Sequence, residues 1–291
     1  MDNGGTKNFF GDRAKTVALL IASGLLWSLG GVFIKTTDAH PFAISAIRSF
    51  TAALCLLAYL RGKPRFVFTR AQWLGALSYA ATLTSFVTAN KLTTSANAIL
   101  LQYTSPIFVA LLCWLIYRTP LFWYDFLSMG GVAAGFVFLL AGSIGYGSAA
   151  GNIVAVSSGF FFGAFMVALK SQKTGSRVET IILGNFAAVL IGLPFLFIYP
   201  IALEAVPPVV FLGAFQIALP YALFAKASER ASALDLSIFP IVEPLFNPLW
   251  VFLATRELPA PMAFVGGVIL LGVITFRSVV MIKLNQNNVN N

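Results

Sequence analysis

Two stretches broken by proline decide the fold of this 291-residue chain: AILLQYTSPIF (residues 98–108) and LSIFPIVEPLF (residues 236–246). In each stretch, a proline and several polar atoms interrupt an apolar segment near its middle. Composition places both stretches inside a membrane, as argued below. Polar groups and interrupted helices are costly at that depth, so such features mark a functional site.

The composition is that of an integral membrane protein. Hydrophobic residues make up 58% of the chain and charged residues 10%, and the mean hydropathy is +0.86. Soluble domains carry about 25% charged residues. The net charge of +9 would suggest nucleic acid as the partner of a soluble protein. In a membrane protein, short loops rich in Lys and Arg set the topology instead.

A span needs about 20 apolar residues, and the sequence offers ten candidate spans. They cover roughly residues 15–35, 41–60, 71–90, 96–117, 122–142, 149–170, 178–199, 207–226, 232–254 and 259–282. No linker between them is long enough for a soluble domain. We expect a cytoplasmic N-terminal tail (1–14), two five-helix repeats (15–146 and 147–283) and a disordered C-terminal tail (284–291).

The distribution of charge predicts the orientation. With ten spans, fifteen of the 19 Lys and Arg residues fall on the face that holds both termini, and three fall on the other face. Arg48 lies within the second span, and we expect its side chain to snorkel outward. Because positive loops stay on the inside, both termini should be cytoplasmic.

An internal repeat relates the two halves. A shift of about 135–138 residues, the kind of weak internal symmetry found in transporters, aligns Ser23-Gly24 with Ser158-Gly159 and Pro106 with Pro244. Lys35 and Lys170 end the first span of each half, where a cation suits the C-terminal helix dipole. Since each half has five spans, the second half runs in the opposite direction. The fold expected is therefore an all-α membrane protein with ten helices in two inverted five-helix repeats.

These features resemble the drug/metabolite transporter superfamily, EamA type. The resemblance covers residues 15–283 and rests on the repeat, on Ser105-Pro106 and on Glu243-Pro244. Within that family, the run from Ser95 through Pro106 looks most like the bacterial aromatic amino acid exporters. The resemblance implies amino-acid or metabolite efflux across a bacterial inner membrane, through a central cavity lined mainly by spans 3, 4, 8 and 9.

Glu243 is the charged residue deepest in a proline-broken span. It lies about eleven residues into span 9, near the bilayer midplane at about 1.5 Å per residue. Three roles remain open: proton coupling, contact with a substrate ammonium, or a hydrogen bond to backbone freed by Pro240 or Pro244. Arg48 is its one obvious counter-charge within the spans.

Several other residues are candidates to line a binding pocket. Trp27, Tyr79 and Tyr103 combine an apolar ring with a polar atom inside a span. The remaining candidates are polar side chains on spans 3, 4 and 8: Ser78, Thr82, Asn97, Gln102 and Gln216. The alternative for all of them is packing with local hydrogen bonds.

Hinge or gating roles fall on small residues and prolines. Small residues one turn apart let helices approach closely, and proline breaks or kinks a helix. The candidates are Gly24, Ser28, Gly159, Gly163, Pro106, Pro240 and Pro244.

The sequence also excludes several functions. It has no phosphate-binding loop, and its single histidine, His40, cannot build a catalytic triad or a metal cluster. We therefore expect no enzyme activity, no cofactor, no metal and no nucleic-acid partner; the partners expected are membrane lipid and a small-molecule substrate. A monomer is compatible with the sequence, which does not determine the oligomeric state. The alternative function is multidrug or quaternary-cation export, in which Glu243 would face the cation.

Overall fold

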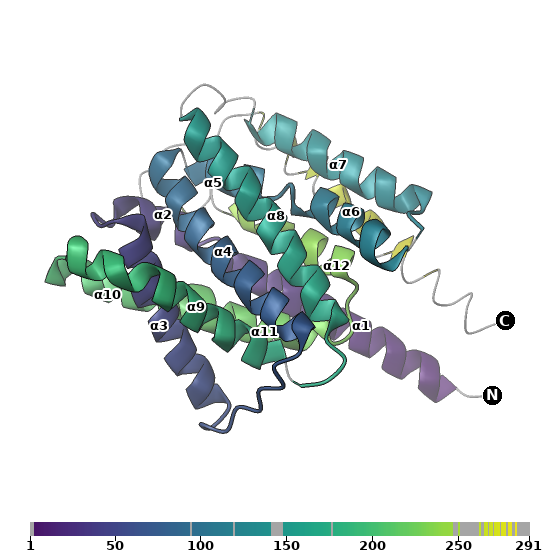
Figure 1. The fold of residues 1–291 in the computed structure, drawn as a ribbon. Coiled ribbons are helices and arrows are strands. Elements are labelled where there is room, and N and C mark those ends of the chain that lie inside the picture. The colour runs from purple at the N-terminus through teal and green to yellow at the C-terminus, as the bar shows by residue number, and fades with distance from the viewer. Residues whose placement is uncertain are drawn as a thin grey trace.

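A computed structural model describes residues 3–93, 95–118, 120–140, 148–175, 177–246 and 250, and residues 262, 265–266, 268–269, 271–273, 275–277, 279–280 and 283. Its elements in these ranges are helices (Figure 1). The all-helical prediction is confirmed for this part of the chain. The predicted tail at 284–291 and much of the predicted tenth span lie outside the described residues.

The described residues of the first half form these helices: α1 (Asn3–Trp27), α2 (Gly30–Thr36), α3 (Pro41–Tyr59), α4 (Arg70–Leu92), α5 (Ser95–Gln102), α6 (Ser105–Tyr117) and α7 (Trp123–Leu140). Local chemistry explains two of the starts. His40 Nδ1 accepts the backbone N–H of Phe42 and Pro41 occupies the first turn of α3, while Thr69 caps α4. α1 begins within the predicted tail and projects beyond the bundle (Figure 1).

The second half begins with α8 (Ala149–Ser171) and α9 (Arg177–Ile198). The predicted eighth span, rich in proline, is divided into η1 (Leu203–Ala205), α10 (Val206–Phe211), a π-helical segment η2 (Leu212–Ala218) and α11 (Leu219–Ser228). α12 (Ala233–Ile238), the 3-10 turn η3 (Phe239–Ile241) and helical residues 242–246 follow.

Both proline-broken stretches are broken as predicted. In the first, a turn at Tyr103 and Thr104 separates α5 from α6, and Pro106 lies in the first turn of α6. In the second, Pro240 lies in the 3-10 turn after α12. Proline is tolerated at both places because a first helical turn leaves its backbone N–H groups without helical partners.

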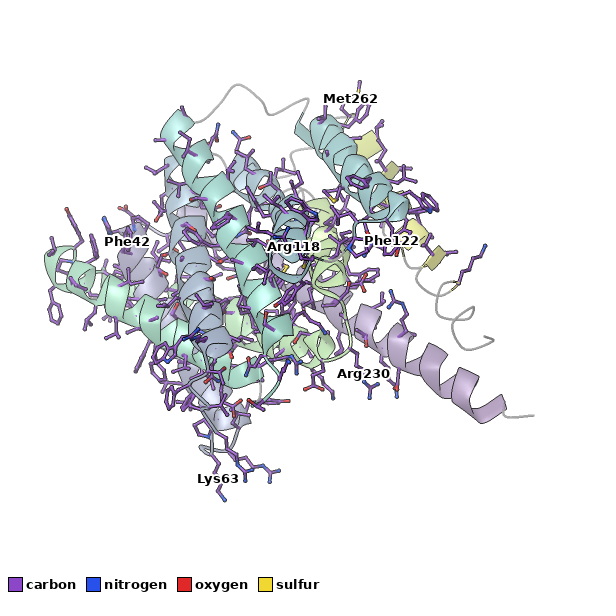
Figure 2. All side chains as sticks on the ribbon, turned by 45° about the vertical axis from the view of Figure 1, so that its right-hand side comes forward. Phe42, Lys63, Arg118, Phe122, Arg230 and Met262 are labelled. Atoms are coloured by element: carbon purple, nitrogen blue, oxygen red, sulfur yellow. The ribbon has the colours of Figure 1, made fainter. Side chains whose placement is uncertain are left out.

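The long helices pack into one bundle. α4 lies along α8, α3 along α9, and α1 along α11 (Figure 1). Five helical segments are long and apolar enough to cross a membrane: Pro41–Tyr59, Asn97–Tyr117, Ala149–Ser171, Arg177–Ile198 and Leu203–Ser228. Large apolar side chains such as Leu190 and Phe197 are exposed on the outside of the bundle. A surface of this kind suits lipid and not water. In Figure 2, Lys63 and Arg230 lie toward one end of the bundle and Met262 toward the other.

Hydrogen bonds between helices recur under the sequence shift. Ser23 on α1 donates to the carbonyl oxygen of Pro220 on α11 over 3.0 Å. The matching serine, Ser158 on α8, donates to the carbonyl oxygen of Thr82 on α4 over 3.4 Å. Ser23 matches Ser158, and Thr82 matches Pro220, at the shift of about 135–138 residues expected of a repeat.

The two lysines of the repeat behave alike. Lys35 Nζ donates to the carbonyl oxygens of Asn90 and Thr93 at the end of α4, and Lys170 Nζ donates to that of Ser228 at the end of α11. Each lysine thus binds carbonyl oxygens at the C-terminus of another helix, the one that contains the third predicted span of its half. The favourable interaction of a cation with a helix C-terminus explains the placement.

Candidate functional site

A buried cavity of about 30 Å³ lies among helices of both halves. This volume holds a water molecule or two, whereas pockets for drug-sized ligands measure about 300–1,000 Å³. The lining mixes aromatic, polar and charged side chains: Trp27, Arg48, Thr82, Leu83, Phe86, Gln102, Phe162, Gln216, Ile217, Tyr221 and Glu243. A substrate of amino-acid size therefore requires the lining side chains or the two halves to move apart.

Five of the nine predicted binding residues line this cavity: Trp27, Thr82, Gln102, Gln216 and Glu243. The other four lie outside its lining: Ser78, Tyr79, Asn97 and Tyr103. Asn97 Nδ2 donates to Thr93 and Asn152, in a separate polar group at the ends of α4 and α8. The Thr82 hydroxyl is satisfied locally, because Thr82 Oγ1 donates to the Ser78 carbonyl oxygen one turn earlier.

The expectation that Arg48 snorkels outward is wrong. Its side chain is 1% exposed, lines the cavity and donates from Nη1 to Gln216 Oε1 over 3.3 Å. The physical reason is the close packing of α3 on the π-helical segment. A Cβ at Gly213 would lie 2.5 Å from the Arg48 carbonyl oxygen, so only glycine lets η2 approach α3 this closely. With η2 this close to α3, the Arg48 side chain reaches Gln216 of η2 and faces the interior.

Tyr103 and Glu243 connect the two proline-broken stretches. The Tyr103 hydroxyl lies 2.7 Å from the carbonyl oxygen of Pro240 and 2.8 Å from Glu243 Oε2. The backbone carbonyl at Pro240 is thus bonded to a tyrosine and not to the glutamate. Glu243 also lines the cavity, so it lies between this hydrogen-bonded group and the interior space.

Gln102 makes the corresponding link from α5. Its Nε2 donates to Ser158 Oγ over 2.7 Å, and Ser158 in turn donates to the Thr82 carbonyl oxygen. This chain of bonds joins α5, α8 and α4 beside the cavity. It leaves the carbonyl of the Gln102 side chain as the polar atom available to a bound molecule.

Aromatic rings form one wall of the cavity. Ring centroids lie 4.8 Å apart for Trp27 and Tyr221, and 4.7 Å apart for Tyr79 and Tyr221. Trp27 Nε1 is buried and has no hydrogen-bond partner among the described residues. Tyr79 Oη is buried near Asn185 and Tyr221, with neither in hydrogen-bond geometry. Buried donors of this kind are costly unless a ligand or water completes them.

Comparison with known proteins gives the family. The EamA-like transporter family matches the chain twice, over residues 14–141 and 149–278. The chain belongs to the EamA-like transporter family. It is 27% identical over 288 residues to an uncharacterized transporter of Archaeoglobus fulgidus, covering 88% of this chain and 95% of that protein. A solved crystal structure with 18% sequence identity has a TM-score of 0.75 and covers 90% of this chain and 97% of its own; it shares the fold.

The chain is therefore a multi-pass membrane protein of a transporter family, and the family resemblance read from the sequence is confirmed at that level. The aromatic amino acid specificity is not part of what these relatives show.

The predicted hinge residues lie where helices of different halves touch. A Cβ at Gly24 on α1 would lie 2.7 Å from the carbonyl oxygen of Pro240, and one at Gly159 on α8 would lie 2.7 Å from that of Gln102. Gly163 faces the first turn of α6, at Ser105. These contacts of small residues are again related by the repeat shift.

The other predicted hinge residues flank these contacts. Ser28 Oγ accepts the indole N–H of Trp250 over 2.6 Å, in the turn between α1 and α2. Pro106 is buried at the start of α6, and Pro244 is buried in the helical residues 242–246. Small residues and prolines therefore adjoin both broken stretches, as a hinge would require.

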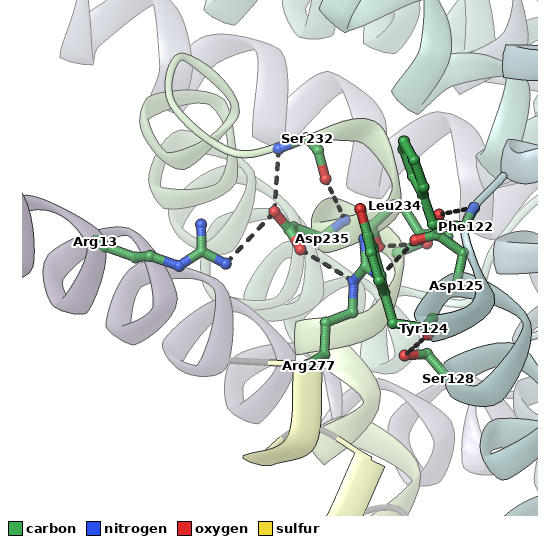
Figure 3. A network of polar contacts seen from close by, with 10 residues as sticks. Arg13, Phe122, Tyr124, Asp125, Ser128, Ser232, Leu234, Asp235 and Arg277 are labelled. Carbon is green, nitrogen blue, oxygen red and sulfur yellow. Dashed lines mark hydrogen bonds and ion pairs between the residues drawn. The ribbon is translucent and has the colours of Figure 1, made fainter. Parts of the chain in front are cut away.

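Sequence reasoning missed an ion cluster that joins Arg277 to Asp125, Asp235 and Arg13 (Figure 3). Arg277, 2% exposed, donates to Asp125 Oδ1 over 2.7 Å and to Asp235 Oδ1 over 3.2 Å. Asp235 also caps α12 with Ser232 and lies 3.7 Å from Arg13. The available signal was a set of acids and arginines near span ends on one predicted face, but nothing in the sequence paired them.

Proposed function

We propose that the chain is a secondary transporter that exports amino acids, aromatic ones first, or related small metabolites across a bacterial inner membrane. Transport proceeds by alternating access through the central cavity. One observation carries the proposal: a buried cavity between helices of both halves, lined by aromatic rings and by Gln102, Gln216 and Glu243. Mostly apolar pockets with a few placed polar groups are typical of small-molecule sites.

The proposed architecture is ten spans in two inverted repeats, 15–146 and 147–283. Three observations support it. The family matches each half separately, and the serine and lysine hydrogen bonds recur at the repeat shift. The Lys and Arg residues also divide fifteen to three between the two predicted faces. Inverted repeats place a substrate site at the interface between halves, near the midplane. Both termini are then cytoplasmic.

Movement of one half against the other would open the cavity to each side in turn. The contacts at Gly24 and Gly159 join an early helix of one half to a broken helix of the other. Interfaces of small residues permit sliding because no side chains interlock. We assign the hinge role to these contacts and to Pro106, Pro240 and Pro244.

The alternative is export of lipophilic or quaternary cations, which also suits an aromatic cavity with a carboxylate. Glu243 favours this alternative. Arg48 weighs against it, because its charge repels a second cation in the same small space.

Flux of labelled amino acids in proteoliposomes tests the proposal. Wild type should move phenylalanine down its gradient, and Glu243→Gln and Tyr103→Ala should reduce the flux. Tyr79 lies outside the cavity lining but packs on Tyr221, which lines it, so Tyr79→Ala tests whether flux depends on this second layer of aromatic rings. An imposed pH gradient decides whether protons are coupled. Flux of a lipophilic cation without flux of any amino acid would overturn the proposal.

A further inference from the structure

Arg48 is a buried cation without a carboxylate partner among the described residues. It is 1% exposed, and within the described part of the chain its side chain makes one hydrogen bond, to a neutral amide, Gln216 Oε1, at the long distance of 3.3 Å. Its Nε has no hydrogen-bond partner in the part of the chain that the structure describes. An isolated charge in such a place is costly unless it is paired. An unpaired arginine is therefore unlike the arginine of the ion cluster, which has two aspartates.

The surroundings of Arg48 form a built site. The guanidinium lines the cavity together with Glu243 and with Trp27, whose indole N–H has no hydrogen-bond partner within the described ranges either. Tyr79 and Tyr221 lie beside it. The described lining of the cavity thus holds one cation, one carboxyl group and donors without a described partner, and no ion pair within 4.0 Å joins Arg48 to Glu243.

A guanidinium presents several N–H donors in a planar fork that matches a carboxylate. An ammonium on the same molecule requires an acceptor at its other end, and Glu243 supplies a carboxyl oxygen on the cavity lining. The aromatic rings of Trp27 and Tyr221 offer apolar area for the remainder of the molecule.

From this arrangement we infer that Arg48 binds the carboxylate of the transported molecule, with Glu243 at the ammonium end. This inference rests on the proposed function and narrows it: the substrate class is small carboxylates, zwitterionic amino acids first. Occupancy would supply the carboxylate partner that Arg48 lacks among the described residues, so bound substrate removes the cost of a buried unpaired charge. A permanent cation without a carboxylate leaves that cost in place.

Binding to the purified full-length protein in detergent micelles tests the inference with three related probes. These are L-phenylalanine, phenethylamine, which lacks the carboxylate, and 3-phenylpropionate, which lacks the ammonium. The variants are Arg48→Gln, Arg48→Lys and Glu243→Gln. Arg70→Gln, at an exposed position in the first turn of α4, is the control that removes one positive charge elsewhere.

In Arg48→Gln, binding of phenylalanine and 3-phenylpropionate should weaken about 10- to 150-fold, the range for a lost hydrogen bond to a charged group. Phenethylamine should bind as to wild type. Glu243→Gln should show the reverse pattern, and Arg70→Gln should match wild type for all three probes. Arg48→Lys keeps the charge without the fork, so it should retain the preference for carboxylates at lower affinity.

Equal weakening of all three probes in Arg48→Gln and Arg48→Lys would mean a structural role for Arg48 and overturn the inference. So would unchanged binding of 3-phenylpropionate in Arg48→Gln. If phenylalanine flux in proteoliposomes persists in that variant with unchanged KM, the inference fails while the proposed function stands. If wild type neither binds nor moves phenylalanine, the proposed function fails as well.

Discussion

Adding one methyl group at Gly24 should destabilise the protein by about 1–2 kcal/mol. The new Cβ of Gly24→Ala would lie 2.6 Å from Val242 Cγ2, 2.7 Å from the Pro240 carbonyl oxygen and 3.0 Å from Pro240 Cα. Two of these atoms belong to the backbone of the 3-10 turn, so they cannot rotate away. Overpacking costs about 1–3 kcal/mol, and the better helix propensity of alanine returns about 1 kcal/mol at most.

The matched control is Gly130→Ala on α7. No atom of the described residues lies within 4 Å of a Cβ at the exposed Gly130, so alanine there should be neutral or stabilise by up to about 1 kcal/mol. Gly159→Ala should behave like Gly24→Ala, because its Cβ would lie 2.7 Å from both the Gln102 carbonyl oxygen and Thr104 Oγ1. We therefore expect similar losses of stability in Gly24→Ala and Gly159→Ala, which are repeat equivalents, and no loss in Gly130→Ala.

Thermal denaturation of the purified variants in one detergent measures the effect, with the midpoint read from the loss of the monodisperse peak after heating. The midpoints of Gly24→Ala and Gly159→Ala should fall by a few degrees relative to wild type. A midpoint for Gly24→Ala at or above that of Gly130→Ala would refute the close contact between α1 and the turn at Pro240. It would also remove the basis for a hinge there.

Three further predictions use the same melting assay. Arg277→Gln should destabilise by about 3–5 kcal/mol, since it leaves the buried Asp125 without its cation and Asp235 with the more distant Arg13 alone; a loss below about 1 kcal/mol would contradict the buried pair. Burial holds the pKa of the His40 imidazole below its ordinary value of 6.5, so the unfolded chain binds the proton more readily and stability should fall as pH drops through 6.5. His40→Asn keeps a helix-capping side chain and should abolish that fall; an identical pH profile would exclude His40 as its source. Tyr103→Phe should cost about 1–3 kcal/mol, because the Pro240 carbonyl and Glu243 lose the hydroxyl they share, and unchanged stability would mean that water replaces it.

Much of the site was predictable because its polar residues stand out in apolar spans. Gln102, Gln216 and Glu243 are polar groups in apolar spans, and all three line the cavity. Tyr103 was predicted as a pocket residue as well; it lies outside the lining of this cavity and donates a hydrogen bond to Glu243, which belongs to the lining. A polar atom in a span signals that a partner exists, but it does not say whether that partner is a substrate or a neighbouring side chain.

The sequence by itself determined the membrane class, the positions of the breaks and the family. These depend on local quantities: the length of apolar runs, the missing N–H of proline and a repeat visible at a constant shift. The sequence does not determine the rotation of each helix about its own axis. Lipid is as apolar as a protein core, so an apolar helix has no amphipathic pattern that distinguishes its buried face from its lipid-facing one.

Only the tertiary structure decided that Arg48 faces the cavity and that Arg277 pairs with Asp125 and Asp235. The first depends on Gly213 letting η2 close on α3, and the second joins residues from three separate spans. The sequence does not distinguish a charged side chain that snorkels from one that pairs with another residue or binds a ligand. Which of these occurs depends on the helix packed against that side chain, because electrostatic interactions are strong in the low dielectric of the interior.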